Sequence, residues 1–255
     1  MARIDLNSDL GEAFGPWAMG DDAAMLGLVT SANVACGGHA GDPETMYTTV
    51  IMAKSKGVVI GAHPGYADLL GFGRRIIPMT AGEIERMVAA QIGALMGVAA
   101  VAGAKVAYVK AHGALANLAA DERGAAEAIA RAVRAVSRDL AVLAISGTEQ
   151  EGAAERQGLE VYSEIFADRG YLPSGRLVPR SKPGAMIEGS EAAAARLLGF
   201  LDSGLMPVMD GVPIRLKAQS ICVHGDSKGA VEMARHLRGA LQAAGVTIAP
   251  FLTSP

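Results

Sequence analysis

Short runs of apolar, often β-branched residues recur along the chain, separated by longer segments with apolar residues at helical spacing. Strands that are apolar on both faces are typical of a parallel sheet covered by helices. Seven such runs predict strands at residues 3–6, 31–35, 58–62, 106–109, 141–145, 160–165 and 218–223.

The amphipathic segments between these runs predict helices that cover the sheet. Strand and helix alternate over all 255 residues, which is typical of α/β folds. We therefore predict a single-domain (β/α) barrel over residues 1–255, with seven strands, and an open doubly wound sheet is the alternative. The predicted helices span residues 44–55, 81–102, 123–136, 147–157, 189–203 and 228–244.

Two long segments lack either periodicity, residues 65–79 and 168–184. Irregular segments of this length in a compact domain often serve as lids or binding loops. We expect both to border a functional site.

The amino-acid composition limits the kinds of binding partner and the cellular compartment that we expect for this protein. A net charge of −3 argues against nucleic acid as the main partner. The two cysteines, Cys36 and Cys222, are far apart and fit reduced, buried thiols in a cytoplasmic protein. No signal peptide opens the chain, no uninterrupted apolar run is long enough to span a membrane, and the Ala- and Leu-rich helices allow a homo-oligomer.

Titratable side chains gather at the carboxyl ends of the predicted strands, the face where parallel α/β folds bind ligands. Four of the five histidines lie there, namely His39, His63, His112 and His224, whereas His236 lies inside a predicted helix. Histidine titrates near neutral pH and suits proton transfer. With Asp9, these residues predict a catalytic cleft.

Other polar residues at the same strand ends are candidates for binding substrate. Lys110, Arg169, Arg180 and Lys182 offer positive charge to an anion. Gly38 lets the backbone approach a ligand closely. The remaining candidates at these ends are Asn7, Glu12, Asn33, Glu164 and Asp168.

Simpler explanations exist for several residues. Asp42 before Pro43 predicts a helix N-cap with proline at the first helical position. Asp226 is a candidate cap for the last helix, and Asn7 and Asp9 could cap the loop after the first strand. Arg74 and Arg75 are typical of a solvated surface pair, and Lys110 could form a structural ion pair.

A divalent metal is an alternative use of the cluster, because Asp9, His39 and His63 follow three successive strands and could ligate one ion. No close ligand spacing supports this set. A Walker-type phosphate loop does not occur in the sequence.

The strand-end segments resemble the LamB/YcsF family from residue 4 to about residue 224. The resemblance rests on residues 5–12 (DLNSDLGE), 33–42 (NVACGGHAGD), 61–66 (GAHPGY), 110–115 (KAHGAL), 166–171 (FADRGY) and 178–180 (VPR).

This resemblance implies the A subunit of an ATP-dependent 5-oxoprolinase, which acts with B and C subunits to convert 5-oxo-L-proline to L-glutamate. It also implies a fold similar to the seven-stranded polysaccharide-deacetylase-like barrels. The ATP site lies on this chain or on a partner. Two alternatives remain: a stand-alone metal-dependent amide or deacetylation hydrolase, and a non-catalytic metabolite-binding subunit.

Under this hypothesis, the residues at the strand ends have two kinds of role. Asp9, His39, His63 and His112 would handle proton transfer and contacts to the oxyanion. Lys110, Arg169 and Arg180 would bind anionic groups.

Overall fold

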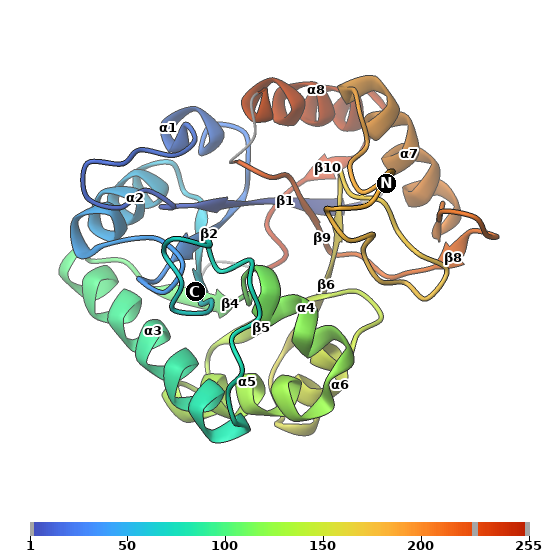
Figure 1. The fold of residues 1–255 in the computed structure, drawn as a ribbon. Helices are drawn as coiled ribbons and strands as arrows, with labels where there is room; N and C mark the ends of the chain where they lie inside the picture. The colour runs from blue at the N-terminus through green and yellow to red at the C-terminus, as the bar shows by residue number, and fades with distance from the viewer. Residues whose placement is uncertain (1–2, 226–228, 253–255) are drawn as a thin grey trace.

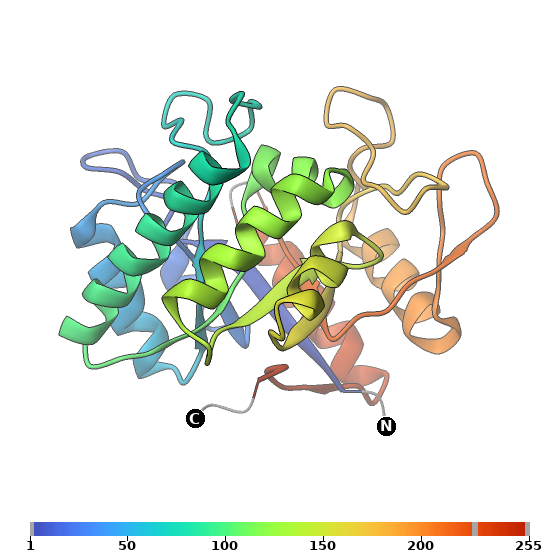
Figure 2. The same ribbon diagram turned by 90° about the horizontal axis from the view of Figure 1, so that it is seen from below.

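The computed structural model describes residues 3–225 and 229–252, and its centre is a closed barrel of seven parallel strands (Figures 1 and 2). The strands pair in the order β1-β2-β3-β4-β5-β6-β9, and β1 also pairs with β9. This last pairing closes the sheet, so the predicted seven-stranded barrel is confirmed and the open doubly wound alternative is wrong.

All seven predicted strands form, with small shifts at their ends. The largest change is in the first strand, which continues through the polar residues Asn7, Ser8 and Asp9. These residues do not cap a loop, as was considered, but lie in the barrel wall. The strands are β1 (Arg3–Leu10), β2 (Ser31–Ala35), β3 (Val59–His63), β4 (Val106–Val109), β5 (Ala141–Ile145), β6 (Val161–Phe166) and β9 (Ser220–Cys222).

The predicted helices also form, and two further helices were missed. The short α1 (Asp22–Met25) follows the first loop. The missed α4 (Gly113–Asp121) begins shortly after the fourth strand, in a segment for which no helix was predicted. The others are α2 (Pro43–Ser55), α3 (Ala81–Val101), α5 (Arg123–Val136), α6 (Glu149–Arg156), α7 (Ser190–Ser203) and α8 (Ala230–Ala243).

Three very short strands complete the chain. β7 (Leu205–Met206) and β8 (Ile214–Arg215) form an antiparallel pair, and β10 (Thr247–Ile248) adds to the start of β1. The predicted cap Asp226 lies outside the described residues.

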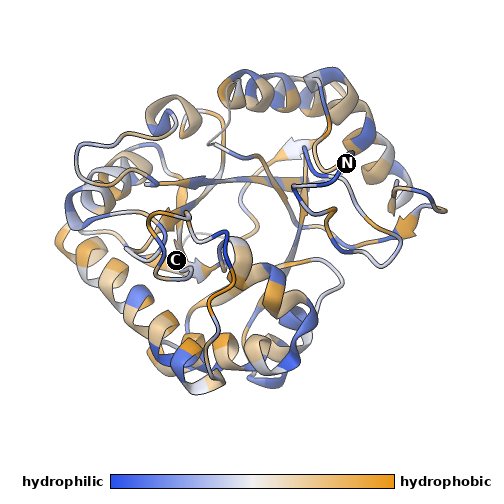
Figure 3. Cartoon of the chain, viewed as in Figure 1, coloured by the Kyte–Doolittle hydropathy of each residue, from blue (hydrophilic) through white to orange (hydrophobic). Residues whose placement is uncertain are grey.

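The helices surround the barrel (Figure 1), and each of the longer ones has a set of buried residues. In Figure 3, hydrophilic and hydrophobic positions alternate around the helices, as expected for an outer layer. The helix α3 is long and apolar enough to cross a membrane by length and composition alone. It nevertheless packs on α2 and α5 and buries Ile84, Val88, Ile92 and Leu95, so it is a core helix of the barrel.

The inside of the barrel is polar, which is unusual for a core. Asp5, Asn7 and Asp9 alternate along β1 and all point inward, because successive residues of a strand face opposite sides. Asp5 accepts hydrogen bonds from Thr30 and Ser31, each 2.6 Å long. These bonds satisfy buried polar groups that would otherwise destabilise the fold, and the layer above them carries the candidate site.

Asp42 caps α2 as predicted and offers a test of the fold. Its carboxylate accepts hydrogen bonds from the backbone N–H groups of Glu44 and Thr45 at 2.9 and 3.0 Å, and from that of Gly15 at 2.8 Å. Hydrogen bonds from the Gly15 and Thr45 backbone lower the pKa of Asp42 to about 2. We expect Asp42→Ala to lower the free energy of unfolding by about 1–2 kcal/mol in a urea titration. Asp42→Asn, which keeps an acceptor, should lose less, and equal losses would contradict the capping role.

Candidate functional site

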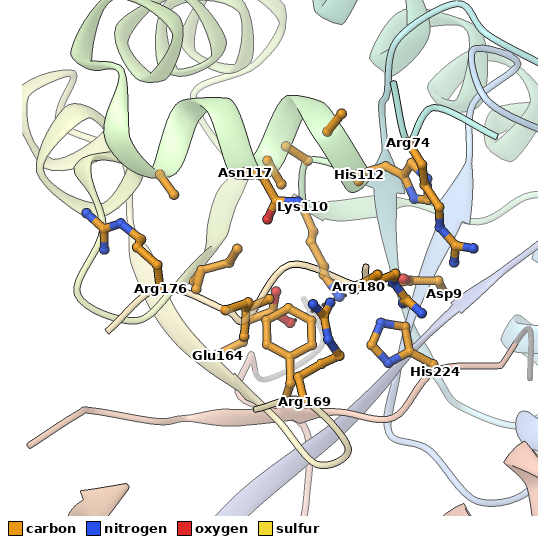
Figure 4. A pocket seen from close by; sticks show the side chains of 18 of the residues that line it. Asp9, Arg74, Lys110, His112, Asn117, Glu164, Arg169, Arg176, Arg180 and His224 are labelled. Atoms are coloured by element: carbon orange, nitrogen blue, oxygen red, sulfur yellow. Dashed lines mark hydrogen bonds and ion pairs between the residues drawn. The ribbon is translucent and has the colours of Figure 1, made fainter. Parts of the chain in front are cut away.

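A cavity of about 460 Å³ opens at the carboxyl ends of the barrel strands, where the sequence predicted a site (Figure 4). Both irregular segments contribute to its wall, through Arg74 and through residues 176–180. Eight of the predicted site residues line the cavity: Asp9, His63, Lys110, His112, Glu164, Arg169, Arg180 and His224.

Lys110 is the centre of the polar floor. Its Nζ lies 3.1 Å from Asp9 Oδ1 and 3.0 Å from Glu164 Oε2, and it also reaches Asn7 Oδ1 at 3.1 Å. Glu164 is 1% exposed and Asp9 is 13% exposed at its side chain. The ammonium therefore holds two carboxylates together, one of them fully enclosed.

This arrangement fixes the charges of the floor. Burial lowers the pKa of Lys110, but Asp9, Cys222 and Glu164 together raise it well above its usual range. Burial raises the pKa of Asp9, and the nearby His63 and Lys110 reverse this and lower it well below its usual range. Lys110 and Asp9 are therefore both charged at neutral pH.

His63 and His112 form a pair with a defined hydrogen-bond pattern. His63 Nδ1 lies 2.8 Å from the carbonyl oxygen of Lys110, and His112 Nε2 lies 2.9 Å from that of Phe72. A carbonyl only accepts, so both of these nitrogens carry hydrogen. The other two nitrogens, His63 Nε2 and His112 Nδ1, face one another at 3.0 Å. Two lone pairs repel at this distance, so a proton or a cation between them stabilises the pair.

His39 and Glu12 lie behind this pair and do not line the cavity. His39 Nε2 donates to Glu12 Oε1 at 3.0 Å, and the His39 ring stacks on His112 with centroids 3.5 Å apart. Burial lowers the pKa of both His39 and His112, that of His112 to about 3, so these rings are neutral at neutral pH. His39 Nδ1 is buried and has no hydrogen-bond partner among the described residues.

These four residues could hold a metal ion. One ligand atom from each of Glu12, His39, His63 and His112 lies within 4.8 Å of the others. Imidazole nitrogens about 2.0–2.1 Å from a common Zn²⁺ stand roughly 3 Å or slightly more from each other, which matches the facing nitrogens of His63 and His112. The predicted set of Asp9, His39 and His63 is corrected: Glu12 and His112 replace Asp9, because Asp9 is held by Lys110 and Asn33.

The metal site leads to a direct test. We expect metal-stripped protein to bind about one Zn²⁺ per chain, with a rise in melting temperature and a stoichiometry measured by elemental analysis. His112→Ala should weaken binding by about tenfold or more. His236→Ala, on the exposed side of α8, is the matched control. Equal binding by both variants would place the ion elsewhere.

On the opposite wall, Asp168 orients His224. His224 Nδ1 lies 2.8 and 2.9 Å from the two oxygens of Asp168, and the His224 ring stacks on Phe166. Burial raises the pKa of Asp168, but the contact with His224 lowers it below its usual range. Nε2 of His224 is therefore the ring nitrogen available to a ligand.

Several arginines also line the cavity. Arg74 and Arg75 are both exposed, as expected of a solvated surface pair, but Arg74 also lines the cavity and lies over the Phe72 ring at 4.9 Å. Arg75 instead pairs with Asp68. Arg176, which the sequence did not single out, also lines the cavity and pairs with Asp121, whereas Lys182 is not among the lining residues.

Besides Glu12 and Asp168, three further predicted binding residues lie outside the cavity for structural reasons. Asn7 and Asn33 are fully buried beneath it, where Asn33 Nδ2 donates to Asp9 Oδ1 at 2.8 Å. Gly38 is required by packing, since a Cβ there would lie 2.4 Å from Gln91 Oε1. Both cysteines are buried and free as predicted, and Cys222 Sγ lies 3.2 Å from Lys110 Nζ.

Comparisons with known proteins agree over nearly the full chain. The LamB/YcsF family matches residues 4–254. The A subunit of 5-oxoprolinase from Rhodopseudomonas palustris is 52% identical over 250 residues, covering 98% of this chain and 98% of that protein. The A subunit of 5-oxoprolinase from Nitrobacter hamburgensis is 50% identical over 252 residues, covering 98% and 99%.

Solved structures show the same similarity in three dimensions. The lactam utilization protein from Thermus thermophilus aligns with a TM-score of 0.91 at 42% identity, covering 97% of this chain and 99% of that one. A protein from Enterococcus faecalis aligns with a TM-score of 0.57 at 14% identity over 98% and 97%, and so shares the fold alone.

Proposed function

The chain belongs to the LamB/YcsF family, and from this premise we propose that it is the A subunit of an ATP-dependent 5-oxoprolinase. In this role it opens the ring of 5-oxo-L-proline to give L-glutamate, together with partner B and C subunits. The observation that carries the proposal is the cavity itself, in which proton-transfer groups and cations share one small enclosed space.

The reaction explains why these groups are needed together. The five-membered lactam is a stable amide, so its carbonyl carbon is a poor electrophile. Phosphorylation of the carbonyl oxygen by ATP activates that carbon toward water. The site must then deprotonate water, stabilise the negative charge that develops on oxygen, and supply a proton to the departing ring nitrogen.

The roles follow from the contacts. The His63–His112 pair is proposed to move the protons, because its facing nitrogens share one site within the cavity wall. Asp9 stabilises positive charge on His63, whose Nε2 lies 3.3 Å from Asp9 Oδ1. His39 acts as a positioning residue, since it stacks on His112 and does not reach the cavity.

Anion binding is proposed for the cationic residues. Lys110, Arg169 and Arg180 all line the same cavity (Figure 4). His224, fixed by Asp168, adds a hydrogen-bond donor or acceptor to the same space. Asn7, Asn33 and Glu164 support Lys110 and Asp9 from below.

A divalent metal, held by Glu12, His39, His63 and His112, is proposed as the alternative to a proton shared between His63 and His112. When bound, such an ion supplies Lewis-acid chemistry and lowers the pKa of a water ligand. ATP is proposed to bind to the assembled enzyme, on this chain or on a partner subunit. The proposed location is the cytoplasm, and self-association through the outer helices remains part of the proposal.

The test is glutamate release from 5-oxo-L-proline and ATP, measured for the chain alone and after mixing with its B and C subunits. We expect glutamate only from the mixture. Absence of glutamate with correctly folded partners would contradict the proposal.

One observation favours a second candidate, a stand-alone metal-dependent amide hydrolase: the buried ligand group of Glu12 and three histidines. This enzyme would act without ATP and lose its activity to a chelator. Glutamate formation that requires ATP would rule it out.

A further inference from the structure

Phe72 has a backbone conformation that bulky residues rarely adopt. Its φ is +54°, in the left-handed region, where the Cβ atom crowds the following carbonyl oxygen. Gly73 follows with a φ of +59°, so two successive residues are left-handed. Strain of this kind persists only where the surrounding structure imposes it, and it is concentrated at functional sites. Phe72 itself does not line the cavity, so its conformation must act through a neighbour.

That neighbour is His112. The carbonyl oxygen of Phe72 accepts a hydrogen bond from His112 Nε2 at 2.9 Å. The Phe72 ring meets the rings of His39 and His112 edge-on, with centroids 5.4 and 5.3 Å apart. The backbone of Gly73 lies so close that a Cβ there would be 2.7 Å from His39 Cβ and 2.9 Å from His112 Cδ2. The chain at Phe72 and Gly73 therefore packs directly on the two stacked histidines.

Asp68 holds this part of the chain in place. Its carboxylate accepts hydrogen bonds from the backbone N–H of Gly71 and from Arg75 Nε, each 2.9 Å long. Its backbone carbonyl oxygen accepts a hydrogen bond from the N–H of Gly73 at 3.0 Å. The hydrogen bond from Arg75 lowers the pKa of Asp68, which is 7% exposed, so the carboxylate is ionised at neutral pH. We call residues 68–75 the Asp68 turn.

The Phe72 carbonyl determines which nitrogen of His112 carries hydrogen. His63 Nδ1 donates to the carbonyl oxygen of Lys110, so a neutral His63 has a lone pair on Nε2. Without Phe72, His112 would carry its hydrogen on Nδ1 and donate it to His63 Nε2, which is 3.0 Å away. With Phe72 in place, that arrangement would turn a lone pair of His112 Nε2 toward the Phe72 oxygen, which is unfavourable. The hydrogen therefore stays on Nε2, and two lone pairs face one another.

We propose that the Asp68 turn keeps the His63–His112 pair ready for its function, with Asp68 and Phe72 as positioning residues that act through His112. The left-handed conformation of Phe72 prevents the two histidines from satisfying one another, so the space between them remains open to a proton or a cation. The expected effect on turnover rests on the proposed function, whereas the position of the hydrogen on His112 does not.

The first measurement is a long-range proton–nitrogen NMR spectrum of the metal-stripped full chain with isotopically labelled histidine. Such a spectrum distinguishes a ring nitrogen that carries hydrogen from one that carries a lone pair. Wild type should show hydrogen on Nε2 of His112. Asp68→Ala removes the acceptor for Gly71 and Arg75, so the turn should relax and the hydrogen should move to Nδ1. Asp139→Ala, which changes an exposed carboxylate, is the control and should match wild type.

Two substitutions of Phe72 separate the effect of its backbone from that of its ring. Phe72→Asn and Phe72→Val both remove the ring, but asparagine is enriched in the left-handed region, whereas a β-branched residue strongly disfavours it. We expect Phe72→Asn to keep the hydrogen on Nε2 of His112 and Phe72→Val to move it. Phe72 is half-buried, so both variants are expected to fold. Equal spectra for these two variants, or a wild-type spectrum for Asp68→Ala, would overturn the inference.

The second measurement is glutamate formation by the assembled enzyme, with kcat and KM determined separately. Asp68→Ala and Phe72→Val should lower kcat by about tenfold or more. They should leave KM for 5-oxo-L-proline close to wild type, because neither Asp68 nor Phe72 lines the cavity. Phe72→Asn should retain most of the wild-type kcat.

The outcomes separate this inference from the proposed function. A rise in KM without a fall in kcat would assign the Asp68 turn to substrate binding and contradict the inference. If the wild-type assembly forms no glutamate, the proposed function fails, and the NMR spectra still decide whether the Asp68 turn positions His112.

Discussion

Replacing Asp9 by asparagine is expected to lower glutamate formation by the assembled enzyme by about 10²- to 10⁴-fold. The substitution keeps the shape of the side chain and removes its charge. Asp9 Oδ1 lies 3.3 Å from His63 Nε2 and 3.1 Å from Lys110 Nζ. Without this carboxylate, positive charge on His63 loses its nearest stabilising partner, and the His63–His112 pair transfers a proton less readily.

The measurement is glutamate production at saturating 5-oxo-L-proline and ATP, with each variant mixed into the same partner preparation. Asp139→Asn, an exposed carboxylate beyond the end of α5, is the matched control and should retain wild-type activity. Activity of Asp9→Asn within about tenfold of wild type would exclude Asp9 from the proton-transfer step.

The same variant has a signature in its stability. Because His63 and Lys110 hold the folded-state pKa of Asp9 well below its usual range, the ionised carboxylate stabilises the fold above the unfolded pKa of about 3.9. This contribution is lost as the pH falls through the folded pKa. Asp9→Asn should therefore melt below wild type at neutral pH, and the difference should narrow under acid conditions.

Replacing Lys110 by methionine is expected to produce the largest loss of stability, about 3–5 kcal/mol in the free energy of unfolding. Methionine keeps the apolar stem and removes the ammonium. Asp9 and Glu164 then face each other without the cation that separates them, and Glu164 is 1% exposed. Turnover should be lost as well, since the floor no longer carries a positive charge.

A double variant separates the charge effect from general damage. Lys110→Met combined with Glu164→Gln removes the ammonium and one stranded carboxylate, so it should be more stable than Lys110→Met alone. Burial raises the pKa of Glu164 even with Lys110 beside it, which shows how costly the isolated carboxylate is. Lys105→Met, on the exposed surface, is the control in the same urea titrations. If Lys110→Met unfolds at the wild-type urea concentration, the ion pairs contribute nothing to stability.

The sequence alone predicted the barrel and the face that carries the site. Apolar strands of four to six residues can be buried on both sides only between helices, so their alternation with amphipathic segments predicts a parallel α/β fold. Because parallel strands all end on the same face, Asp9, His63, His112 and His224 were expected to meet, and in the structure all four line one cavity.

Local patterns failed where a short segment could belong to more than one kind of structure. No helix was predicted over residues 113–121, yet this segment forms α4, in which Ala114, Leu115 and Ala119 pack into the core. Asn7 and Asp9 looked like loop residues and instead continue β1, because the barrel interior supplies hydrogen-bond partners for them.

Only the tertiary structure determines which polar residues contact one another in the site. Lys110 and Glu164 are 54 positions apart (164 − 110) and form one ion pair because β4 and β6 flank β5 in the closed sheet. Glu12 joins the histidine cluster, and Arg74 lines the cavity, because loops from separate strand ends fold over one another. The sequence by itself determined the residue types and their strand ends, since these follow from periodicity. Which charged side chains form pairs depends on distances between strands that are far apart in the sequence. These distances are set when the barrel closes, so no local sequence pattern predicts them.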